Sequence, residues 1–80
     1  MEKEIRIDLH LDEDDTTTVA TAVLDLRGDH FEARGMARRN PVDAPMPIIG
    51  EELAIARALQ ALTAELMDGA HTRIDEFLSA

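Results

Sequence analysis

The stretch G-E-E-L-A-I-A-R-A-L-Q-A-L-T-A-E-L-M, residues 50–67, decides the fold because it contains neither proline nor an internal glycine. Its apolar residues recur at spacings of three and four, which places them on one stripe of a 3.6-residue helix. Two glutamates follow Gly50, where they would meet the positive end of the helix dipole, and Asp68-Gly69 would end the helix. The sequence predicts a helix over about 51–67, whose core-facing stripe consists of Leu53, Ala56, Leu59, Leu62 and Leu66, with Ile55 beside it.

Three strands are predicted before this helix, over about 3–11, 17–26 and 31–38. In the first strand, apolar residues alternate with polar ones, as in a half-buried strand. Gly28 can adopt positive φ and predicts a hairpin through Arg27-Gly28-Asp29-His30 between the other two strands. The inner face of the first strand would consist of Ile5, Ile7, Leu9 and Leu11, and the inner faces of the other two would carry the small residues Ala20, Ala22, Ala33, Gly35 and Ala37.

Two further segments complete the predicted fold. Pro41, Pro45 and Pro47 stop the third strand and form a stiff crossover over 39–50, with Ile48 and Ile49 expected under the start of the helix. A short second helix is predicted over about 72–79, capped by Thr72, with Ile74, Phe77 and Leu78 as its apolar face. The expected fold is a single α+β domain over 1–80: a three-stranded antiparallel meander (β-β-β-α-α) with one long helix packed on one face of the sheet and a short C-terminal helix.

Composition limits the possible partners. The chain has 80 residues, no cysteine and a formal net charge of -9, and it lacks the run of about 18 apolar residues that a membrane span needs. A charge of this sign repels nucleic-acid backbones and anionic lipids on average, so any contact with nucleic acid would have to be local. The sequence therefore predicts a soluble cytoplasmic domain with no membrane partner, and homodimer formation would add the buried surface that so small a chain cannot provide alone.

The residue pattern argues against an enzyme. The one serine, Ser79, lies at the end of the chain, and residues 12–15 resemble a calcium loop only until Thr17 and Val23, where such a loop needs glycine and glutamate. We therefore expect no catalytic residues, no cofactor, no metal and no small-molecule substrate, with weak cation binding by residues 12–15 kept as a minor alternative. The chain has three histidines, namely His10, His30 and His71. They too lack the spacing of a zinc site.

Two groups of residues on the predicted outer face of the sheet are candidate contact sites. Arg34 and Arg38 share that face, Arg39 follows, and Arg6 lies on a strand that could be close. These arginines could contact phosphates, or they could form ion pairs with neighbouring carboxylates. The second group is a candidate dimer face or else scattered apolar surface, and it comprises Val19, Val23 and Met36.

Four stretches resemble a small actinobacterial family with a domain of unknown function, some of whose mycobacterial members are induced in hypoxic dormancy. The stretches are I-R-I-D-L-H-L-D-E at 5–13, A-x-A-x-L at 20–24, G-M-A-R-R-N-P at 35–41 and P-I-I-G-E-E-L-A-I-A-R-A-L at 47–59. The resemblance implies a three-stranded sheet with a helix, similar in fold to double-stranded-RNA-binding domains and ribosome hibernation factors, usually as a homodimer. It implies no catalytic or ligand-binding residues.

Together these observations predict a non-enzymatic, cytoplasmic protein associated with stress or dormancy, which binds a macromolecular partner. The ribosome, or another RNA, is the first candidate partner, contacted through the local arginines. The alternative is a homodimeric protein–protein interaction module that makes no contact with nucleic acid.

Overall fold

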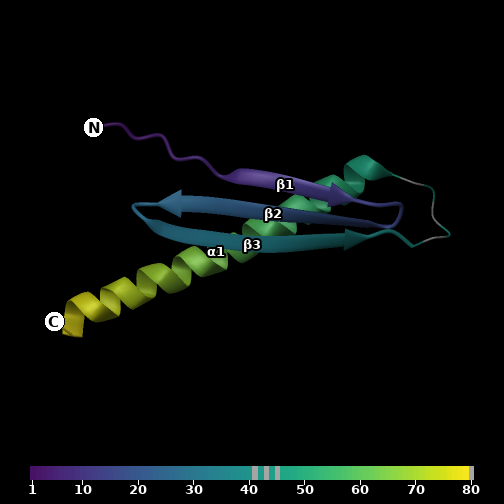
Figure 1. Ribbon diagram of the computed structural model, residues 1–80. Coiled ribbons are helices and arrows are strands. Elements are labelled where there is room, and N and C mark those ends of the chain that lie inside the picture. Colours follow the sequence, from purple (N-terminus) through teal and green to yellow (C-terminus); the bar gives the residue numbers. More distant parts are fainter. Residues whose placement is uncertain (41, 43, 45, 80) are drawn as a thin grey trace.

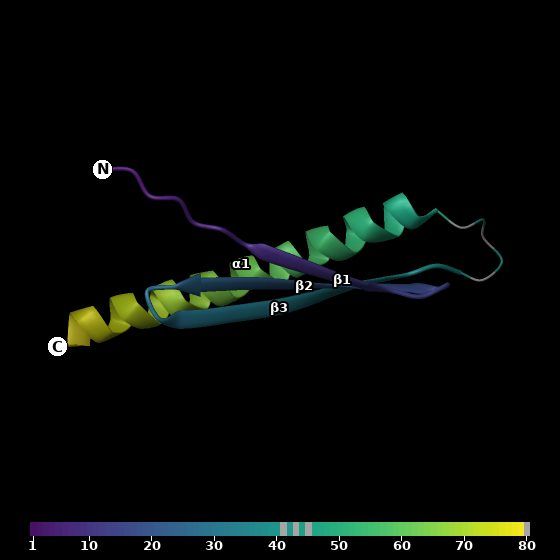
Figure 2. The ribbon, with the colours of Figure 1, turned by 45° about the horizontal axis from the view of Figure 1, so that its top comes forward.

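A computed structural model describes residues 1–40, 42, 44 and 46–79 of the chain. The strands β1 (Asp8–Glu13), β2 (Thr17–Leu26) and β3 (Asp29–Arg38) precede one helix, α1 (Pro47–Ser79) (Figure 1). The strands are antiparallel in the order β1-β2-β3, and α1 lies across one face of the sheet (Figure 2). The predicted α+β fold, a meander with a long helix on one face, is confirmed. Of the crossover prolines, Pro41 and Pro45 lie outside the described residues.

The two strand connections are tighter than the sequence predicted. Between β2 and β3 only Arg27 and Gly28 form the turn, with φ values of 52° and 84°. Two consecutive residues with positive φ make a turn whose twist matches that of the flanking strands. Asp29 and His30, expected in the connection, therefore belong to β3.

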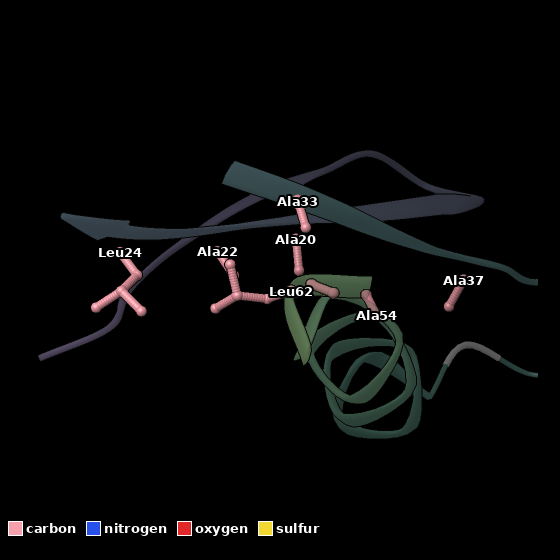
Figure 3. Close-up of a cluster of buried hydrophobic side chains, with 8 residues drawn as sticks. Ala20, Ala22, Leu24, Ala33, Ala37, Ala54 and Leu62 are labelled. Carbon is pink, nitrogen blue, oxygen red and sulfur yellow. The ribbon is translucent and has the colours of Figure 1, made fainter. Parts of the chain in front are cut away.

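Small side chains form the contact between sheet and helix (Figure 3). Ala20, Ala22 and Ala33 are at most 7% exposed on the inner face of the sheet. Gly35 touches the helix backbone, since a Cβ atom added there would lie 2.2 Å from the Ala58 nitrogen. The predicted hollow of small residues is confirmed, and the helix lies in it at backbone contact distance.

The face of α1 that enters this hollow differs from the predicted one. Ala54, Ala58 and Leu62 are the buried residues of the helix, whereas Leu53 is 43% exposed. Ala56, also assigned to the core stripe, is exposed as well. The close approach at Gly35 explains this correction, because alanine is what fits where the two backbones touch. The predicted leucines Leu59 and Leu66 pack at the margin of the core.

The helix is also longer than predicted, at 33 residues. Pro47 is its first residue, where a missing N–H costs nothing, so Glu51 and Glu52 lie beyond the first turn and away from the strongest part of the dipole. Gly69 does not end the helix: among described glycines, positive φ occurs in the β2–β3 turn and not here. The short helix predicted over 72–79 is not observed as a separate element, since these residues form the last turns of α1.

Strand β1 is shorter and less covered than predicted. Residues 1–7 are not in a strand, and Ile5, Ile7 and Leu9 are 58%, 43% and 43% exposed. Only Leu11 of the predicted inner face packs against the core. The reason is the path of α1, which packs on β3 and β2 and not to a comparable extent on β1.

The length of α1 sets the shape of the molecule. At about 1.5 Å per residue a helix of this length extends about 50 Å, whereas a ten-residue strand extends about 33 Å. The C-terminal turns of α1 therefore project past the β2–β3 turn (Figure 1), and the chain measures 57 × 26 × 17 Å. At the other end, Ile48 and Ile49 are 68% and 51% exposed, so they do not pack under the helix as predicted.

Candidate interaction surfaces

The outer face of the sheet brings together most of the predicted contact residues. Strand pairing places Val19 opposite Met36, and Thr21 opposite Arg34. Met36 is 49% exposed, while the two valines of the predicted dimer face are half-buried. Arg38 lies opposite Thr17, one step further along the same face of β3. The predicted phosphate-contact and dimer-face residues thus share one surface, which we call the outer face, defined by Val19, Val23, Arg34, Met36 and Arg38.

Arg34 and Arg38 are exposed and make no ion pair within the part of the chain that the structure describes. Two of the carboxylates on the same face, those of Asp25 and Glu32, are engaged with another side chain. Asp25 and Glu32 both approach His30, at 2.7 Å and 3.5 Å from its ring nitrogens. The guanidinium of Arg34 is therefore available to an external anion.

The other two predicted arginines do not join this pair. Arg39 donates from Nε and Nη2 to the Asp15 carbonyl oxygen, at 3.2 Å and 2.9 Å, and so ties the β1–β2 turn to the end of β3. Arg6 precedes β1, and its guanidinium lies 4.0 Å from the Glu4 carboxylate. Of the four arginines predicted to contact phosphate, Arg34 and Arg38 share a face of the sheet.

His30, which the sequence predicts to be an ordinary exposed residue, has two acidic neighbours in the folded chain. It faces Asp25 across the β2–β3 ladder. The hydrogen bond that the His30 ring donates to the Asp25 carboxylate, followed by the negative charges of Asp25 and Glu32, raises the pKa of His30 above its ordinary value of 6.5. The protonated imidazole is thus the form that the folded hairpin favours.

Asp14 shapes the other turn. Its carboxylate accepts hydrogen bonds from the backbone N–H groups of Thr16 and Thr17, at 2.9 Å and 2.7 Å. These bonds lower the pKa of Asp14, and the charge of Arg38 adds a smaller effect in the same direction. Within the acidic run at 12–15, Asp12 and Glu13 therefore continue β1, and the third residue, Asp14, closes the turn.

Side chains of α1 fix its position on the sheet. Arg57 donates from Nη1 to the Met36 carbonyl oxygen at 2.7 Å, which satisfies an acceptor on the edge strand β3. Further along, Arg73 is hydrogen-bonded and ion-paired to Asp29 at the start of β3. These two contacts anchor the middle of the helix and its later part to the same strand.

Two apolar surfaces of the molecule stay exposed, and one of them lies on the last turns of α1 itself. The first, the open β1 face, is defined by Ile5, Ile7 and Leu9. The second, the C-terminal arm, is residues 70–79, in which Ile74, Phe77 and Leu78 are 54%, 81% and 74% exposed. The alternation and the 3.6-residue spacing of these residues were visible in the sequence, but both patterns predicted burial within one chain.

Within the described residues, no helix is both long and apolar enough to cross a bilayer. The apolar side chains of the arm alternate with charged ones such as Arg73, Asp75 and Glu76. This composition suits contact with another protein surface, where charged groups remain at the rim.

Comparisons of the sequence and of the structure with known proteins point to the same family. The sequence profile of the Rv2632c-like family matches residues 3–80. The uncharacterised protein Rv2632c of Mycobacterium tuberculosis H37Rv is 44% identical over 64 residues, which cover 80% of this chain and 69% of that protein. The uncharacterised protein Mb1767 of Mycobacterium bovis is 43% identical over 56 residues, covering 70% and 60%. The crystal structure of Rv2632c superposes with a TM-score of 0.89 at 38% identity, over 95% of this chain and 90% of that one.

Proposed function

Because the chain belongs to the Rv2632c-like family, whose matched members are uncharacterised, we propose a function from geometry: a homodimeric, non-enzymatic protein–protein interaction module. The observation that carries this proposal is that one chain exposes both the open β1 face and the C-terminal arm. The first lies on β1 and the segment before it, away from the main contacts of α1, and the second is a helix segment whose apolar side chains are exposed.

A second copy of the chain is the occupant that fits both surfaces. The arm of one protomer would cover the open β1 face of the other, and the same exchange in reverse follows from a two-fold axis. Burying an aliphatic or aromatic side chain contributes about 1.5–3 kcal/mol. Since each contact occurs twice in such a dimer, Phe77 and Ile74 alone would supply several kcal/mol.

This arrangement differs from the dimer face predicted from the sequence. Val19 and Val23 are half-buried in the sheet, so the outer face offers mainly Met36 as an exposed large apolar side chain. The arm and the open β1 face offer six such side chains, namely Ile5, Ile7, Leu9, Ile74, Phe77 and Leu78. The larger apolar surface is the better candidate for the contact.

The test measures oligomeric state by sedimentation equilibrium over a range of protein concentrations. We expect a dimer whose dissociation constant rises more than about 100-fold in the double variant Ile74→Ser/Phe77→Ser, because about 3 kcal/mol or more is lost. Val23→Glu on the outer face is the matched control and should leave the dimer intact. Dimer loss in Val23→Glu, with none in the arm variant, would move the interface to the outer face.

Contact with the ribosome or another RNA is the second candidate function, and one observation favours it: Arg34 and Arg38 are exposed without ion pairs among the described residues. If the chain contacts the ribosome or another RNA, we propose that it does so in the cytoplasm during stress or dormancy. Its test is ribosome pelleting from hypoxic cells, in which Arg34→Glu/Arg38→Glu should abolish co-sedimentation. Arg27→Glu, an exposed arginine at the β2–β3 turn, is the control.

Salt separates the two functions. Each chain carries a net charge of -9, so two copies repel one another, and raising the salt from about 50 to about 500 mM should strengthen the dimer. Contacts between arginine and phosphate weaken steeply over the same range, because the release of counterions into a more concentrated salt solution is less favourable. Association that weakens with salt in purified protein alone would contradict the apolar dimer.

A further inference from the structure

The two edge strands of the sheet differ in how far α1 protects them. At β3, Arg57 donates to the Met36 carbonyl oxygen at 2.7 Å, and Arg73 is ion-paired to Asp29. Strand β1 receives no such side chain among the described residues, and α1 packs mainly on β3 and β2. An uncovered edge strand presents unpaired N–H and C=O groups to which another strand can add. We call residues 6–12 the β1 edge.

The hairpin between β1 and β2 determines which backbone groups of the β1 edge are free. The Asp14 N–H donates to the Thr17 carbonyl oxygen at 2.9 Å, and hydrogen-bonded pairs alternate with non-hydrogen-bonded pairs along an antiparallel ladder. Leu9 pairs with Ala22, an odd number of positions from this bond, so the pair is a non-hydrogen-bonded one. The N–H and C=O groups of Leu9 therefore point away from β2, and those of Leu11 do the same. A partner strand must align odd-numbered residues with these two.

One alignment of two antiparallel copies of the β1 edge meets this requirement and also pairs opposite charges. When Leu9 lies opposite its own copy, Arg6 lies opposite Asp12, and Asp8 lies opposite His10. Each charge pair occurs twice because the two copies are related by a two-fold axis. Moving either copy by two residues places Asp8 opposite Asp12 or opposite its own copy, which brings like charges together. The β1 edge is thus complementary to itself in one register.

The same alignment joins exposed apolar side chains. Ile7 and Leu9 are each 43% exposed, and in the pair Leu9 meets its own copy while Ile7 meets Leu11. Paired residues of two strands point to the same side of a sheet, so these side chains extend one apolar face across both chains. The alternation of apolar and polar residues also begins at Ile5, ahead of the first residue of β1, Asp8. This longer alternation suits a strand that continues against a partner.

We propose that the β1 edges of two copies of this chain pair antiparallel around Leu9 and join their sheets into one continuous sheet. The contact uses backbone groups in the plane of the sheet, whereas the C-terminal arm would cover a face, so the two contacts are separate. Backbone hydrogen bonds and exposed ion pairs each contribute little in water. Edge pairing is therefore the weaker contact, and it accounts for the association that remains when the arm is changed.

The first experiment places one cysteine in a chain that has none. In Leu9→Cys the two Cα atoms would lie about 5.5 Å apart, which suits a disulfide. Ile7→Cys is the matched control, because Ile7 is equally exposed but lies about 13 Å along the strand from its own copy. In a glutathione buffer, non-reducing gel electrophoresis should show the disulfide dimer of Leu9→Cys forming at least about tenfold faster than that of Ile7→Cys.

Two outcomes of the cross-linking would overturn the proposal. Equal rates, or a faster reaction of Ile7→Cys, would contradict the alignment around Leu9. No cross-link in either variant would leave the β1 edge to a strand of another protein and would exclude pairing between copies. Leu9→Cys should still cross-link in the Ile74→Ser/Phe77→Ser background, so edge pairing and the arm contact can fail separately.

The second experiment tests the register through charge, by sedimentation equilibrium in the same arm-variant background. Arg6→Glu or Asp12→Arg places like charges opposite each other twice in the pair, so each should weaken association about tenfold. The double variant Arg6→Glu/Asp12→Arg keeps the net charge of -9 and should restore it. Arg27→Glu, at the β2–β3 turn, is the control for net charge. Weakening that the double variant does not reverse, or equal weakening by Arg27→Glu, would contradict the register.

Discussion

The inner face of the sheet is closed over β2 and β3 and open over β1. In the closed half, alanines and a glycine meet two alanines of α1, and the side chains are at most 7% exposed. On β1 and the segment that precedes it, Leu9, Ile7 and Ile5 are all more than 40% exposed. The smaller side chains are thus the buried ones, and several of the larger ones stay outside.

This difference shows that close approach, rather than side-chain size, selects the core of this domain. The helix comes near enough to β3 for backbone contact at Gly35, and at that distance only small residues fit beneath it. A helix seated so close to one edge of the sheet cannot also cover the other edge. The large apolar residues that remain exposed are the ones that we propose for contacts beyond the single chain.

The largest effect is expected where the two backbones touch. Gly35→Ala places a Cβ atom 2.2 Å from the Ala58 nitrogen and 2.3 Å from the Ala54 oxygen, and neither backbone atom can move without shifting α1. We expect the free energy of unfolding to fall by about 3 kcal/mol or more, or the folded state to be lost. Thermal and urea unfolding followed by circular dichroism measure this change.

The same substitution at Gly69 is the matched control. Its Cβ atom would lie 3.4 Å from the Phe31 ring, an ordinary contact, and alanine favours a helix interior over glycine by up to about 1 kcal/mol. Gly69→Ala should therefore raise stability while Gly35→Ala lowers it. A change of the same sign at both positions would contradict the close approach described for the closed half.

An intermediate effect separates buried from open apolar residues within α1. Leu62 is 1% exposed and Phe77 is 81% exposed. Leu62→Ala should lower the free energy of unfolding by about 2–5 kcal/mol, because it leaves a cavity in the core. Phe77→Ala should change it by less than about 0.5 kcal/mol when unfolding is measured at concentrations where the protein is monomeric. Similar losses at both positions would mean that the arm is packed in the monomer.

The smallest effect concerns the exposed β2–β3 hairpin. The pKa of His30 is higher in the folded state than in the unfolded state, so protonation of His30 stabilises the fold. This stabilisation is complete below the unfolded pKa near 6.5. It is lost as the pH rises through the higher pKa of the folded state. The melting-temperature advantage of wild type over His30→Gln should therefore be larger at about pH 5.5 than at about pH 9. In an Asp25→Asn background the pH dependence of this advantage should become smaller, and an advantage that grows with pH would contradict the assignment.

Much of the fold could be predicted from local patterns. Alternation at 17–26 and the small residues at 20, 22, 33, 35 and 37 indicated a sheet with a hollow, and spacings of three and four indicated a helix. The helix ends were predicted wrongly because Gly69 and Pro47 act locally as stop and crossover signals. Packing on Phe31 and the ion pair of Arg73 with Asp29 favour continuation through Gly69, and neither contact is visible in a local window.

The candidate sites were less predictable. The arginine pair on β3 followed from its period-two spacing, but Arg39 turned out to be bound to the Asp15 carbonyl oxygen, a partner 24 residues away in the sequence. The cavity at the start of α1 had no linear motif, because Glu13, Thr18 and Gly50 line it together only when the sheet and helix pack. The run of three threonines at 16–18 was the only hint, and it also suits a strand.

Side-chain period, turn chemistry and the distribution of small residues were enough to specify three strands and a helix, since each depends on neighbours a few positions apart. The angle and offset at which the helix crosses the sheet were decided in three dimensions, by the contact of Gly35 with Ala54 and Ala58. That single placement determines which apolar residues are buried, which are left for a partner, and where a cavity forms. Residues distant in the chain come together there, and no short stretch contains that information.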